Sequence, residues 1–272
     1  MNRDPDGVSV YLLIDNGLLQ EVAASYTEDD SNTRPTWLVP IYTERALAVS
    51  PLLIDLEAAY TSGDLYQVMG YVNALAPALH MSIIETALNL EQLVQHLRRF
   101  ILILDPDGKQ FTLRYADCTV LGQLATLLSA VQWANMKGQI IRWGIHDRSG
   151  NILYLPHPTV AADAVTPLRL NREQIEALDE VSEPDHCIAK VKMMQHGAPL
   201  PGNAAQQHLW AQAAREAWRA SGNSNQLFLL FLTEAALTSR GEVLLMNEIH
   251  GFLLMDEVSA FRDKLRELTD EH

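Results

Sequence analysis

The chain has 272 residues, of which 48% are apolar, and this composition excludes a disordered protein. Lys and Arg number 20 against 34 Asp and Glu, so the formal net charge is -14, divided equally between residues 1–150 and 151–272. Because such an acidic surface repels phosphate, we expect no nucleic acid partner and no membrane partner. A basic or hydrophobic partner suits this charge better.

The sequence also indicates a compartment. The N-terminal stretch MNRDPDGVSVYLLIDNGLL has two aspartates before its apolar run, which is not typical of a secretory signal. The longest apolar run, Leu227 to Leu232, is much shorter than a membrane span. Two cysteines in a chain of this length fit a reducing environment better than a disulfide framework. We therefore expect a soluble, cytoplasmic protein.

The first part of the chain alternates strand and helix patterns. Strands are predicted over residues 8–15, 36–42 and 51–56. Helices are predicted over residues 16–25, 64–79 and 89–99. An exposed acidic loop, TEDDSNTRP, is predicted over 27–35. Asn89 and Gln92 have the spacing of a capping box at the start of the third of these helices.

A β-hairpin is predicted over residues 100–115. Its first part, FILIL at 100–104, is a continuous apolar run typical of a central strand. DPDG at 105–108 is a turn signal, and the alternating QFTLRY follows it. One helix is predicted from about 118 to 134. A second hairpin comes after it, with QIIRWGIHD and ILYL on either side of the turn RSGN.

The composition changes after Leu155. Three prolines in residues 156–168 indicate a linker, and the pattern beyond it is nearly all helical. Asn171 and Gln174 again have the spacing of a capping box, and helices are predicted over 204–220, 225–238 and 257–269. In the 204–220 segment, Arg215 lies on the side opposite the apolar residues.

The sequence therefore predicts an α+β protein. We expect an α/β-type N-terminal lobe over residues 1–155, with a mixed sheet and hairpins. A linker over 156–168 and an all-helical C-terminal lobe over 169–272 are expected to follow.

Motifs for catalysis and for cofactor binding are absent from the sequence. It has no glycine-rich phosphate loop, no G-x-S-x-G elbow and no H-E-x-x-H, and its nine histidines are scattered. We expect no catalytic residue, no metal and no cofactor. Cys118 is the sharpest enzymatic candidate, because the first turn of a helix lowers the pKa of a thiol. Asp117 opposes that effect, and a small apolar residue at a helix start is the favoured interpretation.

Residues 113–121, LRYADCTVL, follow the DG turn and open a helix, and they carry a resemblance to a known family. The segment resembles the F-R-F-Y-D-P-R-V-L type motif of type VI secretion effector chaperones, also called adaptors. Ala116 replaces the usual aromatic residue and Cys118 replaces the proline. YLLID at 11–15, SPLLIDL at 50–56 and GQIIRWG at 138–144 resemble other family segments in the same order. The resemblance covers about residues 8–155.

Three residues of this motif, Arg114, Tyr115 and Asp117, are candidate site residues. Asp117 is a predicted N-cap, because an aspartate before an apolar helical run accepts hydrogen bonds from free N–H groups. Arg114 is predicted to pair with a carboxylate such as Asp117 or Asp15. A structural role for Arg114 and Asp117 is favoured over direct contact with a partner, which stays open.

The helical second half offers a candidate apolar surface for an effector. Residues 225–238, NQLFLLFLTEAALT, are apolar almost all round at their start, so this helix is either core or covered by a partner. A groove beside two of its phenylalanines could receive an effector helix. The candidate residues of this surface are Leu227, Phe228, Phe231, Met246 and Met255. The alternative, a central helix of the C-terminal lobe, is favoured.

The resemblance implies a non-enzymatic function. Family members bind a toxic effector in the producing cell and help to load it onto the secretion spike, the valine-glycine-repeat protein. The resemblance therefore implies an effector as the partner, with the spike as a second candidate partner. An immunity protein that neutralises a toxin is the alternative from another class, and a hydrolase that uses Cys118 is the third hypothesis.

Overall fold

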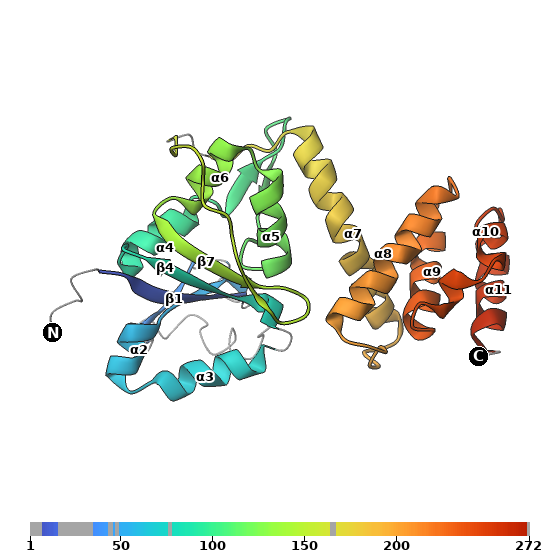
Figure 1. Ribbon diagram of the computed structural model, residues 1–272, viewed down its shortest axis with the longest axis horizontal. Coiled ribbons are helices and arrows are strands. Elements are labelled where there is room, and N and C mark those ends of the chain that lie inside the picture. Colours follow the sequence, from blue (N-terminus) through green and yellow to red (C-terminus); the bar gives the residue numbers. More distant parts are fainter. Residues whose placement is uncertain are drawn as a thin grey trace. The chain divides into compact units, whose positions relative to one another are not determined.

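The computed structural model describes residues 7–15, 35–42, 46, 49–75, 78–163 and 167–270 (Figure 1). The chain divides into two compact units, unit 1 over Met1–Leu178 and unit 2 over Asp179–His272. The helix predicted over 16–25 lies outside the described residues, as does the acidic loop over 27–35 except for its last residue. The α+β class is confirmed, because unit 1 contains a sheet and the described part of unit 2 is helical.

Six strands of unit 1 form one sheet in the order β2-β3-β1-β4-β7-β8. The strands are β1 Ser9–Ile14, β2 Leu38–Pro40, β3 Leu52–Asp55, β4 Met81–Thr86, β7 Ile140–His146 and β8 Ile152–Tyr154. Every pairing in this sheet is antiparallel. The strands predicted near β1, β2 and β3 and the second predicted hairpin are thereby confirmed, with shorter bounds.

Strand β4 is central to the sheet, although no strand is predicted from the sequence at this position. It pairs with β1 on one side and β7 on the other. Its polar residues obscure the apolar pattern, yet two of them are buried because they have hydrogen-bond partners. Ser82 Oγ accepts a hydrogen bond from Trp143 Nε1 at 3.0 Å, and Thr86 Oγ1 donates one to the Gln139 carbonyl at 3.0 Å.

Helices cover both faces of this sheet (Figure 1). Two of them, α2 Leu56–Ser62 and α3 Leu65–Ala74, pack on one face, and a short 3-10 helix, Ala78–His80, follows them. Three helices pack on the other face, namely α4 Leu90–Arg98, α5 Cys118–Leu127 and α6 Ala130–Lys137. The predicted capping box of Asn89 and Gln92 is confirmed at the start of α4.

Two of the helix predictions were too long. Helix α3 spans only part of the predicted range 64–79. The single helix predicted from about 118 to 134 is two helices, α5 and α6. The break occurs because Leu128 has extended backbone and Ser129 starts α6 with a capping box to Gln132.

The first predicted hairpin is confirmed, but its position is not central. Strand β5 Leu102–Leu104 pairs with β6 Gln110–Thr112 in a separate two-stranded sheet. Ile103 is buried whereas Leu102 is exposed, so the FILIL run has one buried face rather than two. The main chain of Leu104 bonds to that of Leu168 and Leu170, whose side chains are buried in the core of unit 1.

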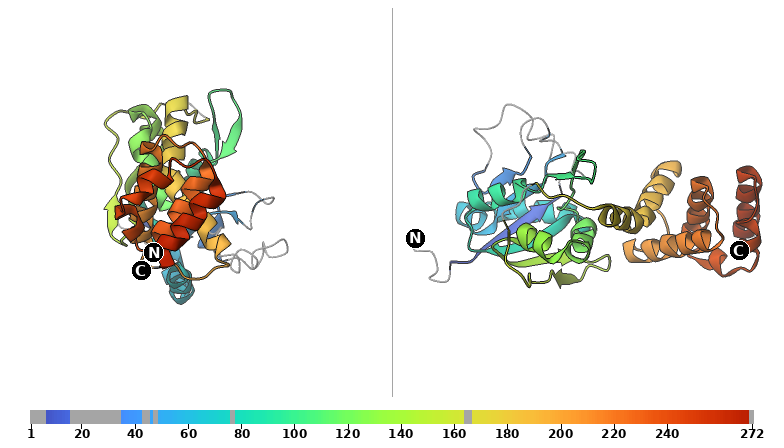
Figure 2. Two further views of the ribbon diagram at one scale, coloured as in Figure 1. Left: turned by 90° about the vertical axis from the view of Figure 1, so that its right-hand side faces the viewer. Right: turned by 90° about the horizontal axis from the view of Figure 1, so that it is seen from above.

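The regular secondary structure of unit 2 consists of helices within its described residues (Figure 2). Helix α7, Arg172–Met194, crosses the division between the units, and the predicted capping box of Asn171 and Gln174 precedes it. The remaining helices are α8 Ala204–Ala220, α9 Gln226–Thr238, the 3-10 helix η4 Glu242–Leu245, α10 Glu248–Phe252 and α11 Val258–Asp270. Within the described ranges, no helix combines the length and apolar character that a membrane span needs.

Candidate functional site

Polar side chains from four segments meet at one end of the sheet in unit 1. Asp15 follows β1 directly, and His80 directly precedes β4, which runs antiparallel to β1. Arg114 lies in the connection after β6, and Asp117 caps helix α5. The four residues are separated by up to 102 positions in the chain, so only the fold brings them together. We call this group the sheet-end cluster.

The strongest contact in the sheet-end cluster joins Arg114 to Asp15. Arg114 Nη2 donates a hydrogen bond to Asp15 Oδ2 at 2.6 Å and lies 4.0 Å from Asp117 Oδ2. Asp15 is 4% exposed, whereas the Arg114 side chain is 57% exposed. Burial would lower the pKa of Arg114, but the charge and hydrogen bond of Asp15 outweigh it, so the pKa is raised. The predicted ion pair of Arg114 is confirmed.

The sheet-end cluster also contains three residues of the types that bind metals. Ligand atoms of Asp15, His80 and Asp117 lie within 4.8 Å of one another. The Arg114 guanidinium lies against both carboxylates, however, and supplies the positive charge that a metal would otherwise bring. In this arrangement the two carboxylates of the cluster face the Arg114 guanidinium instead of a metal ion.

The other two motif residues have structural contacts. Asp117 is the N-cap of α5, as predicted, and its Oδ1 accepts hydrogen bonds from the N–H of Thr119 at 2.9 Å and from its hydroxyl at 2.6 Å. Tyr115 is buried, and its hydroxyl donates to the Leu97 carbonyl at the end of α4 at 3.0 Å. Together with Arg114, these residues connect the hairpin to β1, α4 and α5. Arg114 alone presents a largely exposed side chain.

Cys118 follows Asp117 in the first turn of α5, as predicted, but it has the properties of an apolar residue. It is buried, and its Sγ donates a hydrogen bond to the Met81 carbonyl at 3.2 Å. Burial is the main cause that raises the pKa of Cys118 to about 11, and the charge of Asp117 raises it further. His146 Nδ1 also contacts the Met81 carbonyl, at 2.9 Å. The two side chains share an acceptor, and the thiol is protonated at neutral pH.

Comparison with known proteins assigns most of unit 1 to a family. Residues 10–135, from β1 into α6, match a family described as Domain of unknown function (DUF4123). This chain contains a DUF4123 domain. No curated protein and no solved structure was found to match the chain. The DUF4123 match includes every residue of the sheet-end cluster and stops before β7 and β8, which complete the sheet.

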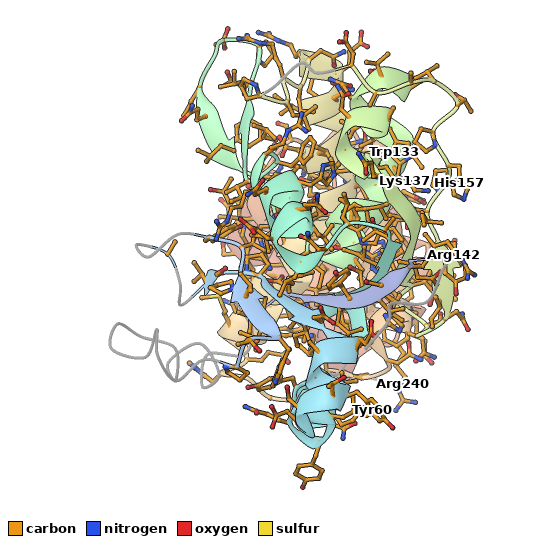
Figure 3. The ribbon with its side chains drawn as sticks, turned by 90° about the vertical axis from the view of Figure 1, so that its left-hand side faces the viewer. Tyr60, Trp133, Lys137, Arg142, His157 and Arg240 are labelled. Carbon is orange, nitrogen blue, oxygen red and sulfur yellow. The ribbon has the colours of Figure 1, made fainter. Side chains whose placement is uncertain are left out.

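The DUF4123 domain also exposes apolar and aromatic side chains that sequence reasoning missed. Four lie on α2 and α3, and Figure 3 shows Tyr60 extending away from α2. The four are Tyr60, Leu65, Tyr66 and Met69. Strand β8, at the edge of the sheet and beyond the family match, exposes Ile152, Leu153 and Tyr154. Exposed apolar groups of this kind are typical of surfaces that bind other proteins.

A buried lysine near the end of α6 was also missed. Lys137 is buried, and its Nζ contacts the Pro156 carbonyl at 3.1 Å and His157 Nδ1 at 3.2 Å (Figure 3). Trp133 Nε1 donates to the same carbonyl at 3.0 Å. Burial lowers the pKa of Lys137. These contacts hold the segment after β8 against α6, and no sequence motif predicts them.

The five candidate residues for an effector surface in unit 2 have different environments. Leu227 is 49% exposed, but Phe228 is 1% exposed and its ring stacks on Phe261 with the centroids 4.4 Å apart. The structure thus corrects the assignment of Phe228 to a surface, because α9 buries it in the helical core. Phe231, Met246 and Met255 are half-buried against the same core.

Phe231 belongs to a groove in unit 2. The groove has a volume of about 510 Å³ and is lined by α9, the turn after it, η4 and α11. Phe231, Ala235 and Leu265 supply apolar lining, and Arg240, Arg262 and Arg266 supply charge, beside Glu234 and Glu242. The Arg262 guanidinium carbon lies 4.7 Å from the Phe231 ring centroid. We call this feature the arginine groove.

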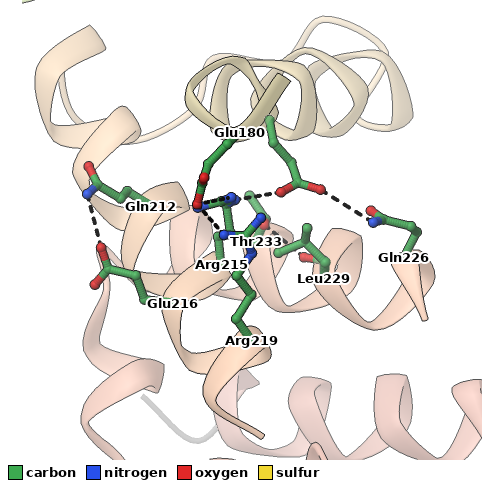
Figure 4. A network of polar contacts seen from close by, with 9 residues as sticks. Glu180, Gln212, Arg215, Glu216, Arg219, Gln226, Leu229 and Thr233 are labelled. Atoms are coloured by element: carbon green, nitrogen blue, oxygen red, sulfur yellow. Dashed lines mark hydrogen bonds and ion pairs between the residues drawn. The ribbon is translucent and has the colours of Figure 1, made fainter. Parts of the chain in front are cut away.

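Arg215 of α8 is a charged residue whose environment differs from the sequence expectation. It lies opposite the large apolar residues of α8, yet it is buried, because α7 covers it with two glutamates (Figure 4). Its Nε donates to Glu183 at 2.5 Å and its Nη2 to Glu180 at 3.0 Å, while Arg219 also contacts Glu180. These hydrogen bonds lower the pKa of Glu180. The network joins α7 to α8.

Proposed function

We propose that this protein is a non-enzymatic adaptor that binds a type VI secretion effector and promotes its loading onto the secretion spike. The observation that carries the proposal is that the chaperone-like motif and the family match overlap in the sequence. The segment with the chaperone-like motif, residues 113–121, lies inside the DUF4123 match over 10–135. Its residues Arg114, Tyr115 and Asp117 join the hairpin to three other elements of that domain.

The chemistry of unit 1 supports binding rather than catalysis. The Cys118 thiol is buried and protonated, which makes it a poor nucleophile. The Asp15 carboxylate of the sheet-end cluster is paired with Arg114, and Asp117 lies 4.0 Å from the same guanidinium. Apolar side chains are exposed on α2, α3 and β8, where a protein partner can cover them.

The expected partners and location follow from the proposed function. The cargo is an effector protein, and the spike protein is a possible second partner. Loading precedes secretion, so the adaptor acts in the cytoplasm of the producing cell. The net charge of -14 makes nucleic acid and anionic membrane unfavourable partners.

Deletion of the gene in the native bacterium tests this function. We expect loss of delivery of the toxin encoded beside it, restored by the wild-type gene, together with a stable complex of the two proteins on co-expression. Assembly of the secretion apparatus and delivery of unrelated effectors serve as controls. Normal delivery of every effector in the deletion strain would contradict the proposal.

Co-expression with the toxin inside one cell separates the adaptor from an immunity protein. An adaptor is expected to permit secretion without protecting the cell from the toxin's activity. Protection without any effect on secretion would favour the immunity function instead.

A further inference from the structure

The arginine groove of unit 2 concentrates positive charge in an acidic protein. Unit 2 contains eight Lys and Arg against fourteen Asp and Glu, yet three of those eight line this one groove. Two glutamates, Glu234 and Glu242, line it as well, so its formal charge is positive by one. The formal charge of the groove lining is therefore positive, whereas the formal charge of unit 2 as a whole is negative.

The guanidinium groups of the three arginines have hydrogen-bond donors that are not used within the described structure. Within the described residues, none of them forms an ion pair or a side-chain hydrogen bond, in contrast to Arg215 and Arg219 of the same unit. Arg262 Nε is buried without a hydrogen-bond partner. A buried donor without a partner is unfavourable, and the Arg262 guanidinium lacks hydrogen-bond acceptors in the unbound protein.

The hydroxyl groups of the groove already form hydrogen bonds within the protein. Thr238 Oγ1 donates to the Glu234 carbonyl at 3.0 Å, and Thr269 Oγ1 donates to the Arg266 carbonyl at 3.1 Å. Ser239 Oγ accepts a hydrogen bond from the Val243 N–H at 3.2 Å. The arginines are thus the main hydrogen-bond donors of the lining that are available to a ligand.

The backbone at Arg240 gives a second, independent observation. Arg240 has a φ of 55°, in the left-handed region that residues with a β-carbon rarely adopt. The turn is closed by the N–H of Gly241, which donates to the Ala236 carbonyl at 2.7 Å. Glycine or asparagine would fit this position with less strain, so an arginine there points to a use for its side chain.

From these observations, we propose that the arginine groove binds a short acidic segment of a partner protein, with an apolar side chain of that segment against Phe231. Carboxylates would accept hydrogen bonds from Arg262, and Arg240 and Arg266 would hold the segment from the rim. Half-buried Phe231 and buried Leu265 supply the apolar contact. The inference rests on the proposed function because it requires a protein partner. It adds that the segment bound in the groove is acidic.

Two fluorescein-labelled synthetic peptides of equal length test the inference with the full chain. Both carry leucines at helical spacing, and their remaining positions are glutamate in one peptide and glutamine in the other. We expect fluorescence anisotropy to show binding of the glutamate peptide, weakened by added salt, and much weaker binding of the glutamine peptide.

Substitutions of the groove arginines should selectively weaken binding of the glutamate peptide. Arg262→Gln and Arg266→Gln are each expected to raise its Kd by about tenfold. Arg266 is exposed, so Arg266→Gln keeps the test valid if Arg262→Gln disturbs folding, which circular dichroism will reveal. Lys264→Gln is the matched control, because it removes one positive charge from the same helix outside the groove lining.

The inference would be overturned by any of three results. The first is no binding of the glutamate peptide, and the second is an equal loss of affinity in Lys264→Gln. The third is binding of a labelled single-stranded oligonucleotide as tightly as the glutamate peptide, because the groove would then be a general polyanion site. None of these results bears on delivery in the deletion strain, so failure of the inference and failure of the proposed function are distinguishable.

Discussion

At the residue scale, the motif residues act through partners that are distant in the chain. Arg114 pairs with Asp15, 99 positions earlier, and Tyr115 bonds to the end of α4. These contacts give a buried carboxylate its counter-charge and a buried hydroxyl its acceptor. The motif is thus explained by the stability of the DUF4123 domain, while the exposed side of Arg114 is free to contact a partner as well.

Replacement of Arg114 by glutamine should destabilise the protein. The buried Asp15 carboxylate would lose its main counter-charge, and we expect a loss of about 1–3 kcal/mol in the free energy of unfolding by urea. Arg114→Lys, which keeps the charge, should lose less.

Lys109→Gln is the control for that measurement, because Lys109 is an exposed residue of the DPDGK turn of the same unit. It should change the unfolding free energy by less than about 0.5 kcal/mol. An Arg114→Gln protein as stable as this control would show that the Asp15 pair contributes nothing to stability.

At the element scale, helix ends and helix contacts have different origins. The starts of α4, α6 and α8 are fixed by capping boxes, in which the cap side chain and a residue three positions later satisfy each other's backbone. The contact of α7 with α8 depends instead on Arg215, which bridges Glu180 and Glu183 from the facing helix (Figure 4). Local sequence determines the first kind of feature, and packing determines the second.

Arg215 and Arg219 form a matched pair for testing this contact, because both bind Glu180. Arg215→Ala should lower the free energy of unfolding by about 1–3 kcal/mol, since it also leaves Glu183 without its cation in a partly buried position. Arg219→Ala removes a half-exposed partner and should lower it by less than about 1 kcal/mol. Thermal unfolding followed by helical circular dichroism measures both, and equal effects would contradict the proposed role of Arg215.

At the scale of the whole molecule, each unit has a hydrophobic core of its own. The cores of unit 1 lie on the two faces of the sheet, and those of unit 2 lie among its helices. Leu121 of α5 belongs to the first set and Phe261 of α11 to the second, and both are buried. Each of these two residues therefore tests the core of its own unit.

Calorimetry of two core variants should report two separate unfolding transitions. Leu121→Ala and Phe261→Ala are each expected to destabilise their own unit by about 2–5 kcal/mol, because they leave cavities, and to lower only one of the transition temperatures. Leu245→Ala, at a highly exposed position in η4, should lower neither. A single transition that both core variants lower equally would contradict two independently stable units.

Apart from the Arg114–Asp15 ion pair, the predicted side-chain contacts that held were local ones. The N-cap Asp117, the Asn89 and Asn171 capping boxes and the hairpin around the DPDG turn all depend on residues within a few positions of one another. The predictions that failed required knowledge of neighbours in space. Strand β4 is central because β1 and β7 flank it, and the 118–134 segment breaks at Ser129 despite a continuous apolar stripe.

The sequence by itself determined the α+β class, the absence of familiar catalytic motifs, the acidic charge and the resemblance centred on residues 113–121. Only the tertiary structure decided which side chains are buried and which are exposed. Phe228 is core and Phe231 lines a groove, although they lie three residues apart on one helix. The physical reason is that burial and pairing depend on side chains brought together from distant segments, as with Arg114 and Asp15 or Phe231 and Arg262.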